Sequence, residues 1–182
     1  MKIIENIKNT IGRYLLHKGI KKTTKKVEVP SFNNIHEIGI VYNATEKSNE
    51  DTILRFANYL REEGKKVFTL GYLDARTLPF NKKLHIQSEY FWKERLTPFN
   101  LPDPVKIGRF MDTHFDLLMN ISFEDILSIQ AISALSKAKY RMAAQIPHAL
   151  SYNETLIDTG SNKDLKNLAM QMEHYLKSVQ RN

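Results

Sequence analysis

Several residue types and patterns that carry chemistry in other proteins are missing from this chain of 182 residues. It has no cysteine, which excludes disulfides, cysteine-ligated zinc sites, iron–sulfur clusters and thiolate catalysis. Its seven glycines do not fit G-x-G-x-x-G or G-x-x-x-x-G-K, the spacings of two common phosphate-binding loops. Neither the nucleophile motif G-x-S-x-G nor the zinc motif H-E-x-x-H occurs. The sequence therefore indicates no catalytic residue, cofactor or metal site. This favours the interpretation that the protein is not an enzyme.

Long hydrophobic runs are missing as well. No apolar stretch approaches the roughly 20 residues that a membrane-spanning helix needs. The apolar residues near the N-terminus are interrupted by Glu5, Lys8 and Arg13, and no small-residue cleavage site follows them. The overall content of 42% hydrophobic and 26% charged residues is typical of a folded domain. We therefore expect a cytoplasmic protein whose mature chain begins at Met1.

The charge of the chain is unevenly distributed. Lys and Arg number 27 against 20 Asp and Glu, which gives a formal net charge of +7. Residues 1–26, called the basic arm below, hold eight of the basic residues and a single acidic one, Glu5. The rest of the chain is therefore neutral, and the excess charge belongs to the arm. The basic residues of the arm are Lys2, Lys8, Arg13, Lys18, Lys21, Lys22, Lys25 and Lys26.

The beginning of the arm, residues 1–19, has the periodicity of an amphipathic helix that ends near Gly19. Its apolar residues recur every three or four positions and so form one stripe along the helix. We call this set the apolar stripe: Ile3, Ile4, Ile7, Ile11, Tyr14 and Leu15. The next residues, 21–26, read KKTTKK and contain four like charges and no apolar side chain. We therefore expect a cationic linker over residues 20–34.

From residue 35 onward, candidate strands and helices alternate. The strand candidates are residues 35–42, 66–70, 115–121 and 140–146. The helix candidates are residues 51–63, 124–136 and 163–179. Alternation of this kind predicts a mostly parallel sheet with helices on both faces. We therefore expect residues 35–182 to form a single α/β domain with a three-layer, Rossmann-like architecture.

Five stretches of this region suggest a relationship to other proteins. They are IGIVYNATE, YLREEGKKVFTLGYLD, FDLLMNIS, ALSKAKYRMAA and LIDTG, the last followed by an amphipathic helix. Together with the basic N-terminal helix, their order resembles a family of small uncharacterised bacterial α/β proteins, a domain of unknown function. The resemblance implies an α/β fold and a cytoplasmic setting, and it brings neither a reaction nor a catalytic residue.

In a parallel sheet, ligands bind outside the carboxyl ends of the strands. The polar residues expected at these ends are therefore the candidates for a small-molecule pocket: Asn43, Thr45, Asp74, Asn120, Ser122 and His148. A nucleotide or a sugar is the ligand class that we considered for such a pocket. Three acidic residues, Glu46, Glu50 and Asp51, surround the first of these turns and oppose the binding of a phosphate group there.

The basic arm is the feature that points most directly to a partner. Its lysines and arginine are suited to the phosphates of RNA, and the leading expectation is a non-catalytic RNA- or ribosome-associated protein tethered by the arm. The arm could instead lie on an anionic membrane surface, with Ile3, Ile4, Ile7 and Ile11 in the interface. A third interpretation docks the stripe on the body of the same chain and leaves a solvated cationic face. A protein partner for the stripe also remains open.

Overall fold

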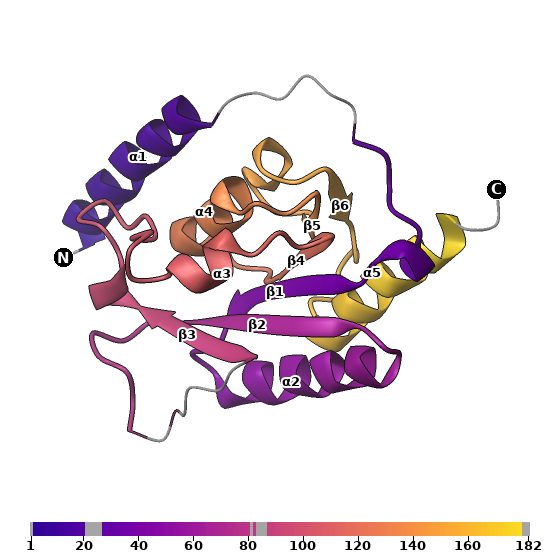
Figure 1. The fold of residues 1–182 in the computed structure, drawn as a ribbon. Coiled ribbons are helices and arrows are strands. Elements are labelled where there is room, and N and C mark those ends of the chain that lie inside the picture. The colour runs from indigo at the N-terminus through magenta and orange to yellow at the C-terminus, as the bar shows by residue number, and fades with distance from the viewer. Residues whose placement is uncertain (1, 21–26, 81, 83–86, 180–182) are drawn as a thin grey trace.

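The chain folds around one sheet of six parallel strands in the order β3-β2-β1-β4-β5-β6 (Figure 1), as seen in a computed structural model. The structure describes residues 2–20, 27–80, 82 and 87–179. The strands are β1 (Glu37–Asn43), β2 (Lys66–Leu73), β3 (Ser88–Trp92), β4 (Leu117–Ile121), β5 (Tyr140–Ala144) and β6 (Thr155–Ile157). The α-helices are α1 (Lys2–Gly19), α2 (Lys47–Glu62), α3 (Gly108–Asp112), α4 (Leu127–Leu135) and α5 (Leu165–Ser178). Short 3-10 helices are η1 (Phe32–Asn34), η2 (Lys93–Arg95) and η3 (Ala149–Ser151).

The strand order creates a point where the connections diverge. The chain runs from β1 outward through β2 to β3, and then crosses to the other side of β1 to begin β4. The neighbouring strands β1 and β4 therefore lead into loops that turn away from each other. In doubly wound sheets this switch point is where a crevice opens outside the carboxyl ends of the strands.

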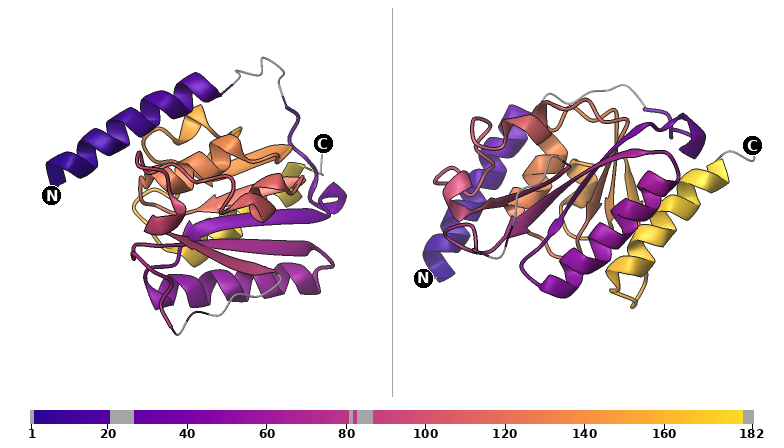
Figure 2. Two further views of the ribbon diagram at one scale, coloured as in Figure 1. Left: turned by 60° about the vertical axis from the view of Figure 1, so that its left-hand side comes forward. Right: turned by 60° about the horizontal axis from the view of Figure 1, so that its bottom comes forward.

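Helices cover both faces of the sheet and make three layers. One face packs against α2 and α5, which run side by side (Figure 2), and the other packs against α3 and α4. The central strands β1 and β4 are buried almost throughout because both of their faces are covered. The expected three-layer α/β architecture with a preceding N-terminal helix is confirmed.

Details differ from the sequence-based expectations where tertiary contacts intervene. Residue 124 does not begin a helix, because its backbone N–H is bonded to Ser122 Oγ in a turn, and α4 begins only at Leu127. The connection between β2 and β3 has no helix among its described residues. Phe32, within the segment expected to be a linker, is 5% exposed and belongs to the core between the sheet and the α2–α5 layer.

Candidate functional site

The helix α1 lies beyond the carboxyl ends of the strands and packs against α4 (Figure 1). Leu16 is 2% exposed and fits into a cluster formed by Leu127, Ala131 and Tyr152. Gly12 allows the closest approach, since a Cβ atom at this position would lie 2.2 Å from the carbonyl oxygen of Phe99. The close approach at Gly12 and the burial of Leu16 therefore position the helix against the body.

Polar contacts fix the same face of α1 to the body. The Arg13 guanidinium donates to Asp125 Oδ2 at 2.7 Å. The Asn100 amide donates to Glu5 Oε1 at 2.8 Å and to Asn9 Oδ1 at 2.7 Å. Glu5, Asn9, Gly12, Arg13 and Leu16 thus lie on one side of the helix, because each is three or four residues from the next one on that side.

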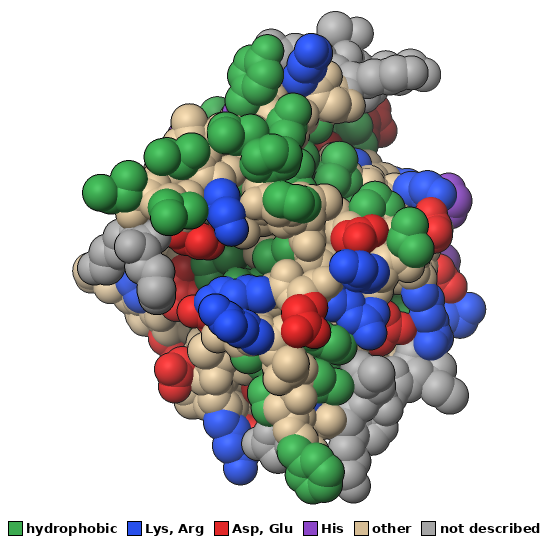
Figure 3. All heavy atoms as spheres, turned by 90° about the vertical axis from the view of Figure 1, so that its left-hand side faces the viewer, with side chains coloured by type: hydrophobic (Ala, Val, Ile, Leu, Met, Phe, Trp, Pro, Cys, Tyr) green, Lys and Arg blue, Asp and Glu red, His purple; other side chains and the backbone are tan. Residues whose placement is uncertain are grey.

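The apolar stripe lies on the opposite side of α1. All six of its side chains are exposed: Ile3 75%, Ile4 62%, Ile7 54%, Ile11 39%, Tyr14 65% and Leu15 39%. Figure 3, viewed from the α1 side, shows hydrophobic side chains gathered along this helix. The interpretation in which the stripe docks on the body is therefore wrong. It assumed that the most apolar face packs inward, whereas Gly12, Leu16 and hydrogen-bonding side chains make the inward face.

The basic residues of the arm divide into three groups. Arg13, whose side chain is 19% exposed, is committed to its ion pair with Asp125. Lys8 is half-buried and Lys18 is exposed, and neither is in an ion pair with another described residue. The side chain of Lys2 and the predicted residues Lys21, Lys22, Lys25 and Lys26 lie outside what the structure describes.

A crevice of about 500 Å³ opens at the switch point between β1 and β4. The loops that follow β1, β2 and β4 form its walls, and α1 contributes Glu5 and Asn9 to its rim. The docked helix therefore completes the crevice. Its lining includes Asn43, Thr45, Glu46, Tyr72, Asp74, Lys93, Glu124, Asp125 and Ser128.

Three of the six predicted pocket residues meet in this crevice. Asn43, Thr45 and Asp74 line it, and Thr45 Oγ1 accepts a hydrogen bond of 3.0 Å from the backbone N–H of Asp74. The other three do not line it: Asn120 is buried and donates to Ser133 Oγ at 3.3 Å, Ser122 is 3% exposed, and His148 lies at the start of η3. Sequence reasoning missed the two contributions from α1, because nothing local indicates that this helix folds back over the strand ends.

Carboxylates dominate the electrostatics of the crevice. Asp74 forms an ion pair with Lys93 at 2.5 Å, and Glu124 accepts a hydrogen bond from the Asn43 amide. Burial, reinforced by the charge of Asp74, raises the pKa of Tyr72 well above its ordinary value, so its hydroxyl stays protonated. The acidic lining opposes a phosphate ligand and suits hydroxyl or N–H donors. The carboxylates are Glu5, Glu46, Asp74, Glu124 and Asp125, against the single base Lys93.

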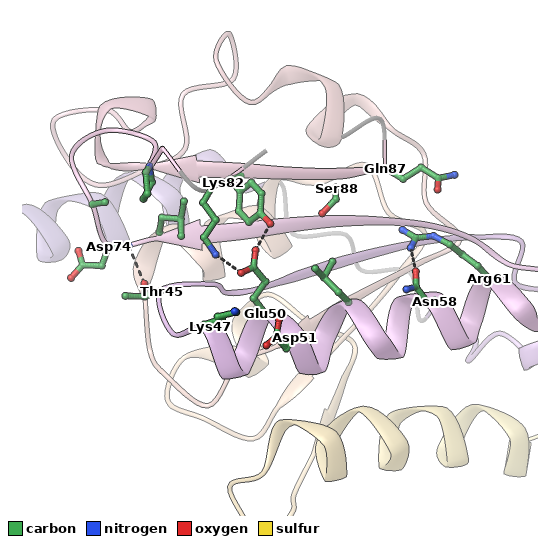
Figure 4. A pocket seen from close by; sticks show the side chains of 15 residues that line it. Thr45, Lys47, Glu50, Asp51, Asn58, Arg61, Asp74, Lys82, Gln87 and Ser88 are labelled. Carbon is green, nitrogen blue, oxygen red and sulfur yellow. Dashed lines mark hydrogen bonds and ion pairs between the residues drawn. The ribbon is translucent and has the colours of Figure 1, made fainter. Parts of the chain in front are cut away.

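A second, larger cavity of about 1220 Å³ lies between α2 and strands β2 and β3 (Figure 4). Glu50, 8% exposed, points into it from α2, accepts a hydrogen bond from the Tyr90 hydroxyl and forms an ion pair with Lys82. Burial, together with the hydrogen bond to Glu50, raises the pKa of Tyr90 far above its usual value. From the sequence, Glu50 is only one of three acidic residues near the start of a helix. Its partners Lys82 and Tyr90 are 32 and 40 residues away along the chain, so no local pattern indicates the cluster.

Within the described ranges, no group of three or more histidine, aspartate or glutamate side chains is placed to hold a metal ion. None of the helices in those ranges is long and apolar enough to cross a bilayer.

Comparison with known proteins adds a family assignment to this geometry. Residues 8–179 match the model of a family of unknown function (DUF6913). The chain belongs to this family. The matched residues include most of α1 and all six strands, so the family model covers both the helix and the α/β body. No curated protein and no solved structure matches the chain.

Proposed function

We propose that this protein is a non-catalytic binding protein whose basic arm attaches the neutral α/β body to a surface rich in phosphate groups. RNA or the ribosome was the first partner expected of such an arm, and a phospholipid surface offers the same chemistry. One observation carries the proposal: α1 docks through one face and presents to the outside its opposite face, which carries the apolar stripe and, at its C-terminal end, the exposed Lys18.

Because α1 is docked on the body, a partner that binds the arm also holds the α/β domain. The contacts of Leu16, Arg13 and Asn100 hold α1 firmly on the body, so a partner of the helix is also a partner of the domain. The body adds no net charge of its own, because all of the excess is in the arm. Binding to phosphates should therefore depend on the arm and decrease steeply with salt.

The test compares two charge variants of the full chain on a ribosomal RNA fragment and on heparin over a range of salt concentrations. The arm variant replaces Lys18, Lys21, Lys22 and Lys25 by glutamine. The matched control makes the same change of charge on the body, at Lys47, Lys66, Lys137 and Lys166. We expect the arm variant to bind at least about ten-fold more weakly and with a smaller salt slope, and the control to bind like the wild type. Equal losses in both variants, or no binding by the wild type to any polyanion, would contradict the proposal.

A second candidate function rests on the crevice. It lies at the switch point, where doubly wound sheets bind ligands, and Asn43, Thr45 and Asp74 meet there as expected. Its carboxylates favour a neutral polar ligand such as a sugar over a nucleotide. The measurement is thermal unfolding with a panel of neutral sugars, with nucleotides as the comparison. We expect a sugar to raise the Tm of the wild type and not that of Asp74→Ala. A panel without effect on the wild type at millimolar concentration would reject this candidate.

A further inference from the structure

Electrostatic binding of phosphates does not account for the exposed apolar stripe. Lys8 and Lys18 can contact phosphates, but six apolar side chains beside them would remain in water on such a partner. Tyr14 is the one aromatic ring of the stripe, whereas single-stranded nucleic acids stack successive bases on several such rings. The other five side chains, four isoleucines and one leucine, are aliphatic and match the hydrocarbon region of a bilayer better than the bases of RNA.

The lysines also argue against a second copy of the chain as the partner. Two copies that paired symmetrically through their stripes would bring two helices of net positive charge into contact. The body offers no compensating excess of negative charge, because it is neutral overall. An anionic surface, in contrast, attracts every lysine of the arm.

We infer that the partner is an anionic phospholipid bilayer, on which α1 lies flat with the apolar stripe inserted among the lipids and its lysines at the headgroups. This inference rests on the proposed function and names its partner. A cationic amphipathic helix with an exposed apolar face binds in the plane of such an interface.

The way α1 is seated makes this binding possible without unfolding. The stripe lies on the side of the helix opposite Gly12, Leu16 and Arg13, which contact the body. The helix of 18 residues is about 27 Å long, so the stripe can enter one leaflet along its whole length. The body remains above the membrane, attached to the inner face of the same helix.

The experiment is flotation of the full chain with vesicles of phosphatidylcholine alone and with vesicles that also contain phosphatidylglycerol. The stripe variant carries Ile7→Gln and Ile11→Gln. Its matched control carries Lys166→Gln and Met170→Gln, both at exposed positions on α5 in the opposite layer. Thermal unfolding of each variant shows that the fold is intact.

We expect the wild type to float only with the anionic vesicles. The stripe variant should bind the anionic vesicles at least about ten-fold more weakly than the wild type, because two apolar side chains no longer leave water on binding. Lys8→Gln and Lys18→Gln should each weaken binding about five-fold, and the α5 control should bind like the wild type.

The alternative outcomes separate this inference from the proposed function. Binding to RNA and heparin without flotation would keep the proposed function and overturn the bilayer as partner. Flotation that is equal for the wild type and the stripe variant would keep attachment by charge and overturn the insertion of the stripe. An absence of binding to vesicles, RNA and heparin alike would overturn both.

Discussion

At the scale of single residues, the role of each side chain depends on its partner. Asp116 stands just before β4. In the structure it accepts hydrogen bonds from the backbone N–H groups of His36 and Glu37 and from Lys139 Nζ. It therefore connects the starts of three neighbouring strands, β1, β4 and β5.

Because of Asp116, the free energy of unfolding should depend on pH in the acidic range. Although partial burial opposes ionisation, the hydrogen bonds from Lys139, Glu37 and His36 lower its pKa to about 2. Because the pKa is lower in the folded state, the stabilisation is complete above about pH 4 and is lost as the pH falls from about 4 to about 2. We expect Asp116→Asn to lower the free energy of unfolding at pH 7 by about 1 kcal/mol after allowance for solvent screening, and by less near pH 3.

Urea unfolding at both pH values measures this effect. Asp112→Asn is the control, because Asp112 forms an exposed ion pair with Lys137 and its side chain is 71% exposed. A difference between Asp116→Asn and the wild type that does not change between pH 7 and pH 3 would contradict the assignment.

Gly12 is the residue that lets α1 approach the body. In an isolated helix, Gly12→Ala would stabilise by about 1 kcal/mol. Here the new Cβ would meet Phe99 O at 2.2 Å and Leu127 Cδ2 at 2.7 Å, so the helix must move outward. We expect faster hydrogen exchange in α1 and a net loss of about 1–2 kcal/mol. Gly19→Ala, where no atom lies within 4 Å of the added Cβ, should leave exchange unchanged.

At the scale of elements, α1 shows that the hydrophobic pattern of a helix does not by itself identify its buried face. The stripe is continuous and apolar, yet the docked face contains Glu5, Asn9, Gly12 and Arg13 with Leu16 as its main apolar anchor. Burial of one well-fitted leucine, a close backbone approach and paired polar groups together hold this helix.

Two adjacent leucines distinguish the faces of α1. Leu16→Ala removes a side chain that is 2% exposed, and we expect a loss of about 2–3 kcal/mol with faster hydrogen exchange throughout the helix. Leu15→Ala, at a position 39% exposed, should change neither quantity measurably. If the proposed bilayer contact is correct, only Leu15→Ala weakens flotation directly. Similar exchange rates in the two variants would show that Leu16 does not anchor the helix.

At the scale of the whole molecule, α1 packs as part of the body. The family match begins inside α1, at residue 8, and the helix covers apolar side chains of α4 and of the segment after β5. The helix therefore differs from the body in charge but shares a packed interface with it.

Removal of residues 1–20 should accordingly destabilise the body. The deletion uncovers Leu127, Ala131 and Tyr152, which are at most 5% exposed in the full chain. We expect the Tm to fall by roughly 5–10 °C, measured by thermal unfolding. The full-length arm charge variant, which keeps this contact, should retain the Tm of the wild type. A truncated chain as stable as the full one would mean that α1 contributes nothing to the fold.

The sequence by itself determined the alternation of strands and helices, the parallel sheet and the confinement of the net charge to the arm. These features depend on hydrophobic periodicity and composition over short segments. Asn43, Thr45 and Asp74 could be predicted as neighbours, because the carboxyl ends of parallel strands meet at one edge. Only the tertiary structure decided which face of α1 is buried, that Glu5 and Asn9 complete the crevice, and that Glu50 meets Tyr90. Such contacts join residues 40 or more positions apart, and their geometry is set by the packing of the whole chain.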